Sequence, residues 1–295
     1  MIKNKCDLCA SRNIKKLFTK ESHDIFVCNS CELQFFNPQP SFKILKKIYS
    51  RNYFLFGSKD KENFQHMSSL KRATAKENLA LISTYYPERT KIQILEIGSG
   101  YGDFLIEANN LGFNVTGVEY SKNNYNVIKS RTKNLSIDLI NGEIFDLVNL
   151  DKQFDIIYFC DVLEHVTNIN LFIDTVKKLL KKNGIIFCIV PSTDHISYKL
   201  MKKKWPEYKL EHLYYFNKKN LKQFLKNNDL LLINVGNSKK HLSIKYINEH
   251  FKKFKVPIIS PIINFLTFLL PKSFKEYHFD VSASGIFMIA KKNEN

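Results

Sequence analysis

The 295-residue sequence is poor in arginine, although it is strongly basic. Only five of its 45 basic residues are arginine, and the formal net charge is +17. Arginine is the side chain best suited to bidentate contacts with phosphates and bases, so its scarcity argues against a nucleic-acid reader. We attribute the charge to a solvated, lysine-rich surface and keep a functional polyanion site as the alternative explanation.

Long apolar runs are also absent. The longest one, 256–270, has 15 residues and is interrupted by Pro257 and Pro261, whereas a membrane-spanning helix needs about 20 residues. The amino terminus lacks the apolar region that a secretory signal requires. These absences predict a cytoplasmic protein without a membrane span, in which 256–270 is a packed helix or a hydrophobic lid.

Cysteine is scarce, but its spacing is informative. Four of the six cysteines form two C-x2-C motifs separated by 18 residues: Cys6, Cys9, Cys28 and Cys31. Two such motifs can present four thiolates to one ion, which predicts a structural Zn2+ site in a zinc ribbon. Disulfides are the alternative, but a reducing cytoplasm disfavours them. Cys160 and Cys188 lie in apolar segments, where we expect core residues.

From about residue 91 onward, short apolar runs alternate with helical patterns. This alternation predicts an α/β protein with a doubly wound, Rossmann-like sheet. We expect three regions: a zinc ribbon over 1–40, a helical linker and lid over 41–90, and the sheet domain over 91–295. The last of these would carry an apolar insertion at about 240–280.

Three glycines follow the first strand of the expected sheet domain. They occupy alternate positions after an acid, in the order Glu96, Gly98, Gly100 and Gly102. A dinucleotide site would have a third glycine where this chain has Asp103. A second acid, Glu119, ends the next strand 21 residues beyond Gly98, where a carboxylate can bind both hydroxyls of a ribose. The pattern therefore predicts a nucleoside ligand without a required pyrophosphate.

At this point the chain resembles class I S-adenosylmethionine-dependent methyltransferases. The resemblance rests on four segments in the expected order: ILEIGSGYG, VTGVEYS, INGEIFD and FDIIYFCDVLEHV. It implies that Glu119 binds the ribose of S-adenosylmethionine and that Glu143 lies near the adenine amino group. It also implies that the loop beginning at Asp161 borders the methionine part of the cofactor.

With its cysteine pairs, its N-P-x-P turn and its tyrosine-rich linker, the chain also resembles sugar C-methyltransferases and related enzymes of glycan and natural-product synthesis. That family uses a glutamate and histidine pair after the fifth strand, which here corresponds to Glu211 and His212 in KLEHLYYFN. The resemblance implies O- or C-methylation of a small molecule: a sugar, a nucleotide sugar or a glycan precursor. RNA methylation and a non-catalytic binding module are the alternatives.

A neutral hydroxyl or C–H acceptor must lose a proton, and histidine is suited to accept one near neutral pH. We predict that His212 is the general base, with His165 in DVLEHV as the other candidate. Aromatic residues in 48–56 and 207–216, with Tyr208, Tyr214 and Tyr215 among them, are expected to wall the acceptor pocket. For Tyr49 and Tyr53, packing between the ribbon and the sheet domain is an equal alternative. Trp205 and the lysines at 202–204 are expected at a lid that meets an anionic acceptor. The sequence leaves the oligomeric state open.

Overall fold

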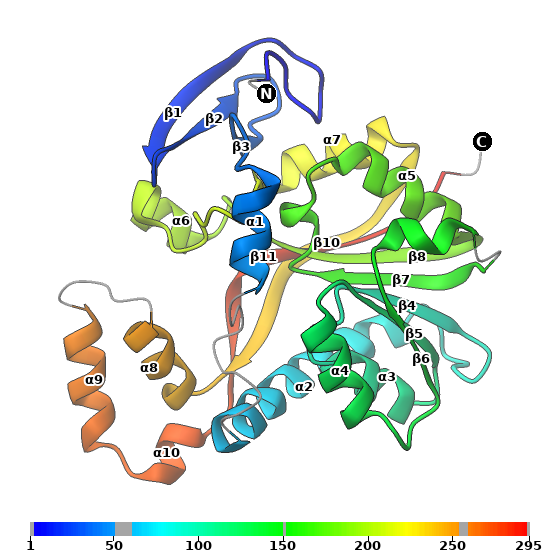
Figure 1. Ribbon diagram of the computed structural model, residues 1–295, viewed down its shortest axis with the longest axis vertical. Helices are drawn as coiled ribbons and strands as arrows, with labels where there is room; N and C mark the ends of the chain where they lie inside the picture. Colours follow the sequence, from blue (N-terminus) through cyan, green and yellow to red (C-terminus); the bar gives the residue numbers. More distant parts are fainter. Residues whose placement is uncertain (1–2, 51–60, 150–151, 254–258, 294–295) are drawn as a thin grey trace.

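The computed structural model of the chain describes residues 3–50, 61–149, 152–253 and 259–293 (Figure 1). Its centre is a seven-stranded sheet with the order β10-β11-β8-β7-β4-β5-β6. The strands are β4 (Gln93–Ile97), β5 (Asn114–Glu119), β6 (Ile137–Asn141), β7 (Phe154–Cys160), β8 (Leu180–Pro191), β10 (Leu230–Leu242) and β11 (Phe279–Lys292). Strands β4 to β8 pair in parallel, whereas β11 is antiparallel to both β8 and β10. The predicted α/β class and Rossmann-like sheet are confirmed.

Helices cover both faces of this sheet because successive strand residues point to opposite sides. Ile157 and Phe159 of β7 pack on the side of α5 (Ile169–Leu179) and α7 (Lys218–Asn227). Ile156 and Tyr158 pack on the other side, with α2 (Lys61–Ser83), α3 (Asp103–Asn110) and α4 (Lys122–Arg131). Two apolar cores therefore hold the sheet from both faces, which fixes the positions of the loops at the strand ends.

The amino-terminal region forms a second, antiparallel sheet. Its strands are β1 (Ile14–Lys20), β2 (His23–Cys28), β3 (Gln34–Phe36) and β9 (Tyr214–Tyr215), in that order. The fourth strand comes from a distant part of the chain: Gln34 pairs with Tyr215, and Phe35 with Tyr214. The ribbon and the large domain are thus joined by a hydrogen-bonded ladder that the sequence pattern did not predict. Helix α1 (Phe42–Ser50) follows the ribbon.

Short helices complete the chain. Two 3-10 turns, η1 (Ile144–Asn149) and η2 (Leu163–His165), follow β6 and β7, and α6 (Ile196–Met201) leads into η3 (Lys202–Lys204). Between β10 and β11 lie α8 (Ile244–Lys253), α9 (Ile259–Leu269) and α10 (Lys272–Glu276), which occupy the segment expected as an apolar insertion. Within the described ranges, no helix is both long enough and apolar enough to cross a membrane.

Candidate functional site

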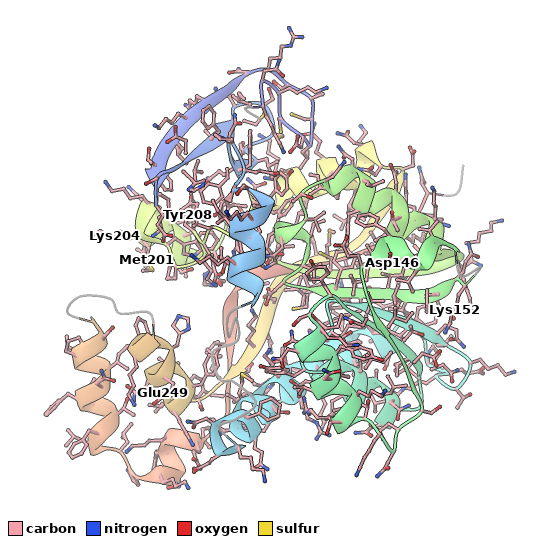
Figure 2. All side chains as sticks on the ribbon, in the orientation of Figure 1. Asp146, Lys152, Met201, Lys204, Tyr208 and Glu249 are labelled. Carbon is pink, nitrogen blue, oxygen red and sulfur yellow. The ribbon has the colours of Figure 1, made fainter. Side chains whose placement is uncertain are left out.

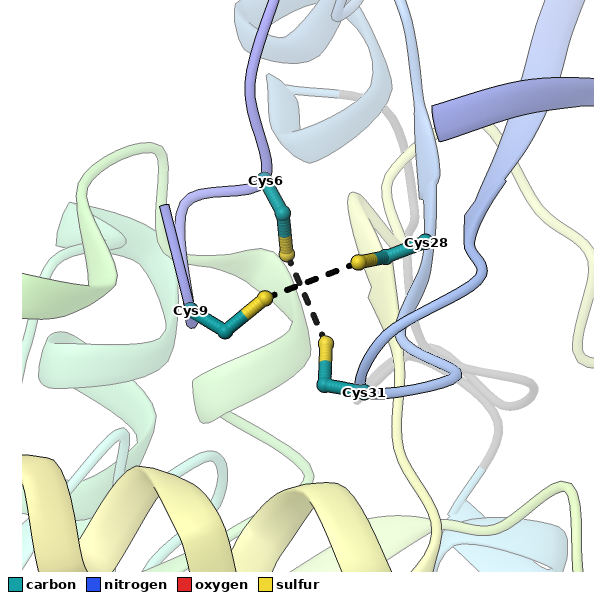
Figure 3. Close-up of side chains that lie close together, drawn as sticks. All are labelled: Cys6, Cys9, Cys28 and Cys31. Atoms are coloured by element: carbon teal, nitrogen blue, oxygen red, sulfur yellow. Dashed lines mark hydrogen bonds between the residues drawn. The ribbon is translucent and has the colours of Figure 1, made fainter. Parts of the chain in front are cut away.

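The four paired cysteines converge at one point of the ribbon (Figure 3). The sulfur atoms of Cys6 and Cys31 lie 3.6 Å apart, and those of Cys9 and Cys28 lie 3.5 Å apart. A tetrahedron with Zn–S bonds of about 2.3 Å places its sulfur atoms roughly 3.8 Å apart, so the cluster has the size that Zn2+ requires.

The two C-x2-C motifs also adopt the same backbone turn. The N–H of Ala10 donates to the carbonyl of Cys6, and the N–H of Glu32 donates to the carbonyl of Cys28. Ala10 and Glu32 both have positive φ, at 56° and 67°. This repeated geometry turns both thiols of each motif toward the same centre, as a closed structural metal site needs.

The glycine loop lies at the carboxyl end of β4. Gly98, Gly100 and Gly102 have φ values of 74°, 58° and 80°, which side chains other than glycine rarely adopt. A Cβ atom at Gly98 would lie 2.7 Å from Cγ2 of Val162, and one at Gly102 would lie 2.9 Å from Cγ2 of Ile128. The loop therefore needs glycine for its conformation and for close packing at these two positions.

Glu119 ends β5 beside this loop. Its carboxylate accepts hydrogen bonds from the N–H of Gly100 at 2.9 Å and from the N–H of Ser121 at 2.8 Å. The side chain is buried, and this burial raises the pKa of Glu119 above its ordinary value. The predicted ribose acid thus lies against the glycine loop, at the carboxyl edge of the sheet where ligands of doubly wound folds bind.

Two further buried carboxylates lie near the loop. Among the described residues, Oε2 of Glu96 and Oδ2 of Asp103 are buried without a hydrogen-bond partner. Burial, and then the charges of Asp103 and Glu119, raise the pKa of Glu96 well above its usual range. Unpartnered buried acceptors are costly, and a ligand with a positive charge would satisfy them. The loop and its acids therefore fit S-adenosylmethionine, which carries an ammonium and a sulfonium.

The other two predicted cofactor residues lie at the same edge of the sheet. Glu143 is exposed in the turn after β6, and Asn141 beside it donates from Nδ2 to the carbonyl of Glu119 at 2.8 Å. Asp161 follows β7 with a φ of 54°, and its carboxylate accepts a 2.9 Å hydrogen bond from Nζ of Lys240. The structure therefore brings the ends of β4, β5, β6 and β7 together around one site.

A second cluster of chemical groups follows β7. Glu164, His165 and His212 have ligand atoms that all lie within 4.8 Å of one another. Glu164 is 0% exposed and His212 is 4% exposed. Among the described residues, both carboxyl oxygens of Glu164 and Nδ1 of His212 are buried without a hydrogen-bond partner. A carboxyl group with two imidazoles can exchange protons or hold a divalent cation.

The imidazole of His165 has a defined tautomer. Its Nδ1 lies 2.9 Å from the carbonyl oxygen of Glu211. Because a carbonyl oxygen only accepts, Nδ1 carries the proton in the neutral ring and Nε2 has the lone pair. Burial lowers the pKa of His165 to about 4 and lowers that of His212 well below its ordinary value.

The three predicted catalytic residues are thus close together but not equivalent. Glu211 contributes its backbone carbonyl to His165, and its own carboxyl group is half-buried with a raised pKa caused first by burial. Glu164, which sequence reasoning did not single out, lies in the same DVLEHV segment as His165. Its complete burial is the signal that sequence alone could not provide.

The expected aromatic pocket wall is wrong for several residues. Trp205, Tyr208, Tyr214 and Tyr215 are all buried. Trp205, Tyr208 and Tyr215 pack with Ile25 and Phe36 of the ribbon, so they join the ribbon to the large domain instead of facing a ligand. Figure 2 shows Tyr208 beneath the ribbon and Lys204 at the outer edge of the molecule. Tyr53 and the side chain of Tyr49 lie outside the described residues.

Residues 66–235, more than half of the chain, match the family model of a methyltransferase domain, and the chain belongs to this family. It is an S-adenosylmethionine-dependent methyltransferase. This result confirms the predicted enzyme class and supports S-adenosylmethionine as the cofactor.

Similar curated proteins include two named ubiquinone biosynthesis O-methyltransferase. The one from Bartonella tribocorum is 39% identical over 98 residues, which is 32% of this chain and 40% of the relative. The one from Rickettsia typhi is 34% identical over 106 residues, which is 35% of this chain and 43% of the relative. The chain thus spans less than half the length of these curated relatives.

Solved structures resemble a larger part of the chain. Magnesium protoporphyrin IX methyltransferase from Synechocystis, with bound S-adenosylhomocysteine, has a TM-score of 0.54 at 12% identity and covers 85% of this chain and 100% of its own. The plantazolicin methyltransferase BamL has a TM-score of 0.52 at 16% identity, with 85% and 99% coverage. At these identities the likeness shows the fold alone.

Proposed function

We propose that this methyltransferase methylates a hydroxyl oxygen of a small molecule, with His165 as the proton acceptor. The observation that carries the proposal is the contact between Val162 and the glycine loop: only the absence of a Cβ at Gly98 leaves room for the Val162 side chain. Glu164 and His165 lie two and three residues after Val162, so two members of the acid–imidazole cluster belong to the segment that packs against the glycine loop.

Bound S-adenosylmethionine supplies an electrophilic methyl group on its sulfonium. The residues of the chain must then orient the acceptor, exclude water and remove a proton. The neutral His165 ring presents Nε2 as the acceptor of the hydroxyl proton, and the Glu211 carbonyl holds the ring in this tautomer. The buried Glu164 and His212 behind it position the ring and share the acquired charge.

This proposal reverses the roles that the sequence predicted for the two histidines, because the sequence favoured His212 as the general base. His212 is almost fully buried, so it is poorly placed to touch an acceptor, whereas His165 is half-buried. Nδ1 of His212 lies 3.8 Å from Oε2 of Glu207. His212 is therefore proposed as a positioning residue and His165 as the catalytic base.

For the acceptor we retain a sugar, a nucleotide sugar or a glycan precursor. The lysines at 202–204 are exposed, and an anionic acceptor stays a prediction from the sequence. A small phenol is the second candidate, because two curated relatives carry the name of a ubiquinone biosynthesis O-methyltransferase. C-methylation and RNA methylation are further outcomes of the same test.

The test measures S-adenosylhomocysteine release with nucleotide sugars, small phenols and RNA as separate acceptors, in wild type and in His165→Gln. We expect turnover with a small hydroxylated acceptor and a roughly hundredfold or greater loss of kcat in the variant, with unchanged affinity for S-adenosylhomocysteine. Turnover with RNA alone, or a His165→Gln variant as active as wild type, would refute the proposal.

We also propose that Cys6, Cys9, Cys28 and Cys31 bind one structural Zn2+. Their sulfur spacing and the matched turns support this assignment. Cys28→Ser should lose the metal and unfold at a lower temperature, whereas the half-buried Cys160→Ser should keep one zinc per chain. If active wild type contains a second divalent ion and His212→Gln loses it, Glu164, His165 and His212 are instead a metal site.

The cytoplasmic location stays a prediction.

A further inference from the structure

Helix α9 has its polar and apolar faces reversed relative to an ordinary surface helix. Ser260 and Thr267 are each only 5% exposed, and Asn264 on the same face is half-buried. These polar residues lie three to four positions apart, so they form one stripe along the helix. Asn264 and Thr267 line a hollow shared with Asn248 of α8. The helix therefore turns its polar face toward the protein.

The opposite face of α9 is apolar and exposed to solvent. Its exposed side chains are Ile262, Phe265, Leu266, Phe268 and Leu269, of which Phe268 is 80% exposed. The apolar surface continues onto α10 and the residue after it, where Phe274 and Tyr277 are also exposed. We call these seven side chains the α9–α10 patch. A soluble surface helix normally shows the opposite arrangement, with its apolar face buried.

The patch lies at the outer edge of the molecule, as Figure 1 shows: α8 stands between α9 and the rest of the chain. Nothing among the described residues covers its exposed side chains. Contiguous apolar surfaces of this kind mark interaction sites on otherwise polar proteins. The position of the patch leaves it accessible to a broad, flat partner.

Lysines border the patch, and two of them pair with acids: Lys252 with Glu249 and Lys272 with Glu62. From His250 to Lys275 the sequence contains five lysines and no acidic residue. Lys252, at the end of α8, and Lys272 and Lys275, on α10, lie on the elements that flank α9. An apolar helix face bordered by lysines is complementary to an anionic lipid bilayer, which offers both an acyl interior and negative headgroups.

We propose that the α9–α10 patch docks the enzyme onto an anionic membrane surface. The 11 residues of α9 extend only about 16 Å, too short to cross a bilayer, so the helix lies in the interface with its apolar face in the lipid. The aromatic rings of Phe265, Phe268 and Phe274 enter the acyl boundary. The flanking lysines contact headgroup phosphates.

The proposal is tested by co-sedimentation of the full chain with vesicles of phosphatidylcholine alone or with one-third phosphatidylglycerol. We expect binding to the anionic vesicles that weakens as salt rises, because the lysine contribution is screened. Phe265→Ser with Phe268→Ser should reduce this binding at least tenfold, since each ring loses its apolar contact with lipid.

The matched control is Leu171→Ser with Leu231→Ser, which removes two similarly exposed apolar side chains from α5 and β10. This control should bind vesicles as wild type does. Equal binding by the phenylalanine variant, or no binding by wild type, would overturn the proposal. If wild type instead binds no vesicles and forms a concentration-dependent dimer, while the phenylalanine variant stays monomeric, the patch is assigned to contact with a second copy of the chain.

Discussion

The imidazole rings of His165 and His212 stand edge-to-face, with their centroids 4.7 Å apart and their planes at 87°. The two residues come from segments 47 positions apart, and a backbone hydrogen bond between the N–H of Leu213 and the carbonyl of Glu164 ties these segments together at 2.7 Å. The two rings therefore pack against each other, and both lie beside the buried Glu164.

This pairing predicts that His165 and His212 act as one unit. His165→Gln and His212→Gln should each lower kcat by about a hundredfold or more, and the double variant should be little worse than the weaker single variant. The measurement is steady-state turnover together with S-adenosylhomocysteine affinity, which should stay unchanged. His23→Gln on the exposed part of the ribbon is the control. Additive losses would show that the two rings act independently.

The close packing at Gly98 predicts a specific effect of a methyl group. Gly98→Ala should weaken S-adenosylhomocysteine binding at least tenfold, because its Cβ would meet Val162 at 2.7 Å and shift the loop. Gly112→Ala is the matched control: it has a φ of 90° but no atom within 4 Å of the new Cβ. Both variants carry backbone strain, and isothermal titration calorimetry should show that only Gly98→Ala loses affinity.

The burial of Glu119 predicts a pH dependence of cofactor binding. Because its pKa is raised, this carboxylate takes up a proton at a higher pH than an ordinary glutamate, whose pKa is about 4.3. Protonation removes an acceptor for the ribose hydroxyls. The Kd of S-adenosylhomocysteine should therefore rise as pH falls toward the raised pKa, and Glu119→Gln should bind weakly with little dependence on pH. A wild-type Kd that is flat down to pH 4.5 would contradict this role.

Arg131 of α4 makes three hydrogen bonds that hold the glycine loop in place. Its guanidinium donates to Oδ1 of Asp103 at 2.8 Å, to Oγ of Ser68 at 2.6 Å and to the carbonyl of Tyr101. Lysine cannot make these contacts together. Arg131→Lys keeps the charge but loses hydrogen bonds, so it should lower the free energy of unfolding by about 2 kcal/mol, measured by urea denaturation. Lys129→Gln, an exposed change on the same helix, should be neutral within about 0.5 kcal/mol.

The parts of the molecule that sequence predicted are those with short, repeated local patterns. Each C-x2-C motif, the glycines after β4 and the acid that ends β5 can be recognised from a short segment of the sequence. The strand and helix alternation is of the same kind, because each strand buries both faces and each helix buries one.

The parts that sequence missed depend on contacts between distant segments. Tyr214 and Tyr215 form only a two-residue strand, which has no periodicity of its own and exists because β3 lies beside it. Trp205 is expected at a lid from the sequence, but it packs against Ile25 and Phe36 of the ribbon. Glu164 is an ordinary acid in sequence, and only the folded loop removes it from water.

The pairing of β3 with β9 means that the ribbon cannot be regarded as a detachable module. Tyr214, two residues after His212, pairs in the ladder with Phe35, four residues after the cysteine at position 31. A two-residue strand has no stability by itself. A protein beginning at residue 41 would lack β3, the pairing partner of the segment that follows His212, so we expect it to lose turnover.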